Sequence, residues 1–120
     1  MNGYPTVEKT IPPGARPFSD YQSVRTEGSA YTAALDASRT ARNGPGYLST
    51  MTVANDTAGK VTVKAYDNTT NSGTEIATLI VPAGDTRNAV INAAFYNGVT
   101  FAIVGTASAS VVVSASLGNP

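Results

Sequence analysis

The chain has 120 residues, a length that suits one domain. Eight basic residues balance eight acidic ones, and only 13% of the residues are charged, about half the usual share. This balance argues against nucleic acid as a partner, because phosphate binding needs clustered Lys and Arg. The sequence has no Cys and no His, which excludes disulfides, thiol chemistry and the commonest general base and transition-metal ligand. No apolar run reaches the roughly 20 residues that a membrane span needs, so we expect no membrane partner.

Residues 1–20 are predicted to form an extended N-terminal arm. Prolines at positions 5, 12, 13 and 17 interrupt any helix or strand ladder there. Such an arm cannot build a core of its own. The domain's own surface or a neighbouring chain could cover it, and we favour the neighbouring chain. The side chains predicted to make that contact are Tyr4, Val7, Ile11, Arg16, Phe18 and Tyr21.

The remainder, residues 21–120, is predicted to be all-β. Apolar and polar side chains alternate with period two along several segments, so that each segment can bury one face. The expected strands are one or two within 21–35, followed by 47–54, 60–66, 74–81, 89–96, 99–104 and 109–117. Residues 36–43 are expected to form a loop, with room for one helical turn. Turn signals at this spacing favour a single compact antiparallel β-sandwich or barrel-like domain of seven or eight short strands.

Turn residues predict how these strands pair. The turn at 55–59 is expected to fold strand 60–66 back on strand 47–54. Asn97-Gly98 is the strongest short hairpin signal and is expected to join 89–96 to 99–104. Strand 74–81 is apolar on both faces, so we expect it to be central or covered. The result would be a meander from Tyr47 onward, with the earlier strands completing a second sheet.

Two arrangements of carboxylates could carry chemistry. The loop from Asp67 to Glu75 holds two carboxylates and several oxygen donors, which suits either a calcium site or a solvated hairpin loop. Paired carboxylates hydrolyse sugars when a few ångströms apart, but Asp56, Asp67, Glu75 and Asp85 all lie in or beside predicted turns. We therefore expect no catalytic site, no metal and no cofactor, and a protein that is not an enzyme.

Four runs together resemble small virion structural proteins of tailed bacteriophages. They are 61–68 (VTVKAYDN), 72–77 (SGTEIA), 79–84 (LIVPAG) and 98–103 (GVTFAI). The resemblance implies a capsid decoration (cement) protein, made in the host cytoplasm and located on the capsid surface of the virion. It implies a homotrimer that binds the major capsid protein through the arm and one edge of the β domain. The alternative is a tail or fibre accessory module that binds another virion protein, or host carbohydrate through exposed Tyr66 and Tyr96.

Overall fold

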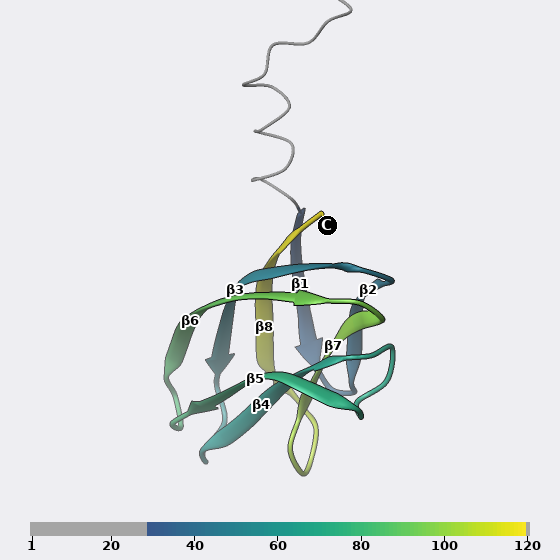
Figure 1. The fold of residues 1–120 in the computed structure, drawn as a ribbon. Coiled ribbons are helices and arrows are strands. Elements are labelled where there is room, and N and C mark those ends of the chain that lie inside the picture. The colour runs from purple at the N-terminus through teal and green to yellow at the C-terminus, as the bar shows by residue number, and fades with distance from the viewer. Residues whose placement is uncertain (1–28, 120) are drawn as a thin grey trace, which may run out of the picture.

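The computed structural model describes residues 29–119, which contain eight strands and no helix (Figure 1). The strands are β1 Ser29–Leu35, β2 Arg39–Asn43, β3 Gly46–Asn55, β4 Val61–Asp67, β5 Thr74–Val81, β6 Thr86–Phe95, β7 Gly98–Ile103 and β8 Ser108–Gly118. The prediction of an all-β chain is confirmed. Within the described residues, no helix is long and apolar enough to cross a membrane.

The strands form two four-stranded antiparallel sheets, in the orders β1-β8-β3-β6 and β2-β7-β4-β5. Figure 1 shows β8 between β1 and β3, with the end of β8 beside the start of β1. The chain changes sheet at every connection except the one between β4 and β5. This strand order is that of an eight-stranded jelly roll, in which two sheets cover each other.

The core lies between the two sheets and takes side chains from both. Its largest fully buried members are Phe95, Phe101, Leu35, Leu48, Met51, Val53, Val63, Val81, Val99, Val111 and Val113. Tyr31 of β1 stacks on Phe101 of β7 across the gap, with ring centroids 6.2 Å apart. Each fully buried side chain of this size contributes about 1.5–3 kcal/mol relative to an exposed one, so the inward-facing residues of the period-two pattern supply a large favourable term for folding.

Residues 36–43 are not the predicted loop, because β2 occupies much of this stretch. Arg39 and Thr40 pair with Phe101 and Thr100 at the edge of the second sheet. Ala41 packs against the core. Pairing with β7 therefore overrides the local helix preference of the Ala and Arg residues, as tertiary context commonly does.

The predicted pairing of strands 47–54 and 60–66 is wrong, and so is the meander. β3 pairs with β6 and β8, whereas β4 pairs with β5 and β7. The 55–59 turn exists, but it carries the chain from one sheet to the other. β5 is an edge strand, not a central one, and its Ile80 side chain is 52% exposed.

Asn97-Gly98 also fails to form a hairpin, since β6 and β7 belong to different sheets. A type I′ turn requires positive φ at both central residues. Among the described non-glycine residues only Asn92 has positive φ, so Asn97 lacks that conformation. Gly98 has φ 146°, and a Cβ there would lie 2.6 Å from the Arg42 carbonyl oxygen. The glycine permits a close approach of β7 to the neighbouring strand β2 within the same sheet.

Asn55 ties together two turns at one end of the domain. Its side chain is buried, and its Nδ2 donates to the carbonyl oxygens of Gly59, Val81 and Pro82 at 2.9, 3.1 and 3.1 Å. Its Oδ1 accepts hydrogen bonds from the backbone N–H and the hydroxyl of Thr57. The β3–β4 and β5–β6 connections are thus held together at the point where the chain changes sheet.

We expect Asn55→Ala to lower the free energy of unfolding by about 2–3 kcal/mol, because it leaves buried carbonyl groups without donors. Urea unfolding followed by circular dichroism measures the change. The control is Asn88→Ala, which removes one exposed hydrogen bond to Thr52 and should cost less than about 1 kcal/mol. Equal costs for the two variants would contradict this role for Asn55.

Candidate functional site

The side chains predicted to bind a partner, Tyr4, Val7, Ile11, Arg16, Phe18 and Tyr21, lie outside the described residues. The structure does describe where that segment joins the domain. It precedes β1, an edge strand, whose first residue Ser29 pairs with Leu117. Tyr47 pairs with Gly118 at the same end of this sheet. The described part of the chain therefore begins at a sheet edge and at one end of the β-sandwich.

The loop from Asp67 to Glu75 uses its carboxylates for internal contacts. Asp67 Oδ1 accepts the backbone N–H groups of Tyr96 and Asn97, at 3.0 and 2.8 Å. Glu75 Oε1 accepts a hydrogen bond from Lys64 Nζ at 2.8 Å. The two carboxylates thus have different partners, and no group of three acidic, His or Cys side chains in residues 29–119 could hold a metal ion. The loop serves as a structural connection.

The same loop covers part of the outer face of its own sheet. The Thr100 hydroxyl on β7 donates to the Asn68 carbonyl oxygen at 2.8 Å, and the Thr40 hydroxyl on β2 donates to that of Thr69 at 3.1 Å. Thr100 is consequently almost fully buried although its side chain points away from the core. The β2-β7-β4-β5 sheet is therefore partly covered on both sides.

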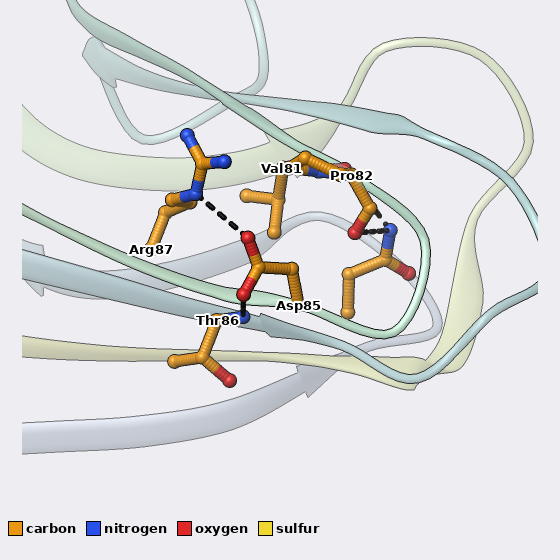
Figure 2. A network of polar contacts seen from close by, with 6 residues as sticks. Val81, Pro82, Asp85, Thr86 and Arg87 are labelled. Carbon is orange, nitrogen blue, oxygen red and sulfur yellow. Dashed lines mark hydrogen bonds and ion pairs between the residues drawn. The ribbon is translucent and has the colours of Figure 1, made fainter.

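Two ion pairs shift the pKa values of exposed groups. The hydrogen bond from Lys64, followed by one from Thr78, lowers the pKa of the Glu75 carboxyl. The bond to Glu75 raises the pKa of Lys64. Arg87, and then the backbone N–H of Thr86, lower the pKa of Asp85, and both contacts are drawn in Figure 2. These groups stabilise loops and strand edges and do not converge on a cleft.

The aromatic side chains proposed for sugar stacking differ in exposure. Tyr96 is 74% exposed directly after β6, whereas Tyr66 on β4 is only partly exposed. Tyr47, which is 37% exposed, lies opposite Ala94 near the end of β6. Tyr47 and Tyr96 therefore lie at one end of the same strand pair.

The outer face of the β1-β8-β3-β6 sheet carries no charge. Three successive rows run across this face, and each row takes one residue from each of the four strands. We call these twelve residues the charge-free face. The rows are Ala30, Ser116, Thr50 and Val90; Thr32, Ser114, Thr52 and Asn88; and Ala34, Val112, Ala54 and Thr86. Within residues 29–119, the charged residues lie on the other sheet or in connections, with one exception. The exception is Arg87 on β6, which pairs with inward-facing Val53 and so does not belong to the outer face. The sequence alone did not identify this face, because only strand order brings its rows together.

No family model matches the sequence, and no curated protein matches it.

We expect the melting temperature to fall as the pH drops below about 4.5. Glu75 and Asp85 start from ordinary pKa values of 4.5 and 3.8, and their folded-state pKa values are lower. Their stabilising contribution is thus present above the unfolded-state pKa and is lost as the pH falls through the folded-state pKa. The effect should be small, because exposed ion pairs contribute little.

Differential scanning calorimetry from pH 6 to pH 2.5 measures this dependence. The double variant Glu75→Gln/Asp85→Asn should be less stable at pH 6 and should lose less stability on acidification than the wild type. Asn71→Ala, a change in the same exposed loop without a titratable group, should keep the wild-type slope. An unchanged slope in the double variant would assign the acid sensitivity to other carboxylates.

Proposed function

We propose that this chain is a structural virion protein, a capsid decoration protein that binds the outer surface of a capsid shell. The partner is the major capsid protein, and contact is made by the N-terminal arm and the adjoining edge of the β domain. The observation that carries the proposal is the attachment of the 28 residues before Ser29 to edge strand β1. An edge strand presents unpaired backbone groups, which another chain can use for pairing.

The chemistry of the described domain supports a contact function. The carboxylates of Asp67, Glu75 and Asp85 have internal partners, so they hold the fold together. Jelly rolls occur in viral capsid proteins, and also in lectins and cupins. Because one fold hosts many functions, the proposal depends on the arm, the edge and the phage-like sequence runs together.

Deleting residues 1–18 should leave the domain folded, because residues 29–119 supply two complete sheets and a core between them, and it should abolish attachment to shells. Attachment is measured by co-sedimentation with capsids of the encoding phage that lack the decoration protein. Circular dichroism and the melting temperature establish that the truncated chain is folded. Tyr96→Ala, which alters an exposed ring outside the arm, is the matched control and should bind fully.

Full occupancy of shells by the truncated chain would refute the role of the arm. Failure of the intact chain to bind any shell or tail preparation of that phage would refute the proposed function as a whole. Binding to tails alone would move the protein to a tail accessory role.

A second candidate is a tail or fibre module that binds host carbohydrate. It is favoured by the exposure of Tyr96, with Tyr47 at the same end of the β3–β6 pair. Exposed aromatic rings stack on the apolar faces of sugars, and lectins share the jelly-roll fold.

On a glycan array of bacterial surface sugars, this candidate predicts binding that Tyr96→Ala reduces at least about tenfold, the loss of one stacked ring. Tyr66→Ala should have a smaller effect, because that ring is already partly covered. A silent array together with tight shell binding would eliminate the carbohydrate function.

A further inference from the structure

We propose that two copies of this chain pair through their charge-free faces, with the β1-β8-β3-β6 sheet of one copy packed against the same sheet of the other. This contact is separate from the proposed attachment to a shell. Most of the face is only partly exposed, but Val90 is 68% exposed at its edge. Its polar groups are hydroxyls and one amide.

The lack of charge selects the partner surface. A charged side chain brought against this face would lose water without gaining a counter-ion, which is costly. The matching surface must therefore also be free of charge. The opposite sheet does not qualify, because Lys64 and Glu75 form an ion pair on its outer side and the 68–73 loop covers part of it. Within residues 29–119, the matching surface of similar extent is the charge-free face of a second copy.

A face that pairs with itself is related to its partner by a two-fold axis, and residues near that axis meet their own copies. Ser114 and Thr52 lie opposite each other in the middle row. Hydroxyl groups both donate and accept hydrogen bonds, so a hydroxyl is complementary to itself. A Lys or Glu in the middle row would instead face the same charged residue of the second copy across the axis. The composition of the face therefore suits an isologous contact.

The small side chains permit close approach. Two sheets pack about 10 Å apart when their facing side chains interdigitate. From strand spacing and rise per residue, the face covers about 400 Å² per copy, roughly half of a standard interface. We therefore expect a reversible dimer with a Kd on the order of 10–100 μM. A three-fold ring, as the phage resemblance implies, would instead require two different surfaces on each copy.

Sedimentation velocity of the full chain from 5 to 500 μM tests the pairing. The wild type should pass from monomer to dimer, and Thr52→Lys should raise the Kd at least about 100-fold by placing like charges near the axis. Thr62→Lys introduces the same change on outward-facing Thr62 of β4 in the other sheet, and should leave the Kd unchanged. Melting temperatures establish that each variant is folded.

Two further variants separate lost pairing from lost folding. Ser114→Lys on β8 should weaken the dimer as Thr52→Lys does. Mixing Thr52→Lys with Thr52→Glu should restore a dimer, because the charges then oppose each other across the axis. Restored pairing in the mixture supports the two-fold contact directly.

Three results would overturn the inference. They are a wild type that stays monomeric at 500 μM, a trimer mass, and a dimer equally stable in Thr52→Lys. A monomeric wild type whose shell attachment is lost on Thr52→Lys would assign the face to a foreign protein. Because the measurement uses no shell, its outcome is independent of whether the chain decorates capsids.

Discussion

Mutual burial of the two sheets is the constraint on which the rest of this structure depends. Each sheet has one apolar face, and neither face is stable in water unless the other covers it. The chain meets this requirement by changing sheet at every connection except β4–β5. The connections must then cross between layers, and this explains why Asn55 is buried with its amide bound to carbonyl groups.

The outer faces of the two sheets differ in charge and in how far the chain itself covers them. On the β2-β7-β4-β5 sheet, the 68–73 loop folds back over Thr100, and Lys64 and Glu75 form an ion pair. On the β1-β8-β3-β6 sheet, the face has only short, uncharged side chains. The first face is partly covered within the subunit, and the second is the face for which we propose self-pairing. The polar groups that sequence inspection offers as catalytic or metal-binding candidates belong to the structural connections.

Contact surfaces account for the proposed function better than a pocket does. The N-terminal segment joins the domain at edge strand β1, which supplies Ala30, Thr32 and Ala34 to the charge-free face. The proposed attachment to a shell would use the arm and the backbone edge of β1, whereas the proposed self-pairing would use the side chains of the charge-free face. If both contacts form, pairing would strengthen attachment, because each paired copy would raise the effective concentration of the other.

The sequence by itself determined the all-β class, the positions of most strands and the inward-facing residues, because period-two alternation is a local property of each strand. It did not determine which strands pair. The Asn97-Gly98 signal and the 55–59 turn are compatible with hairpins, but long-range pairing sends both connections across to the other sheet. Strand β2 was missed because its pairing with β7, and not its own composition, makes it extended. Only the tertiary structure places Thr32, Ser114, Thr52 and Asn88 in one row, since neighbours in a sheet are set by strand order and are far apart along the chain.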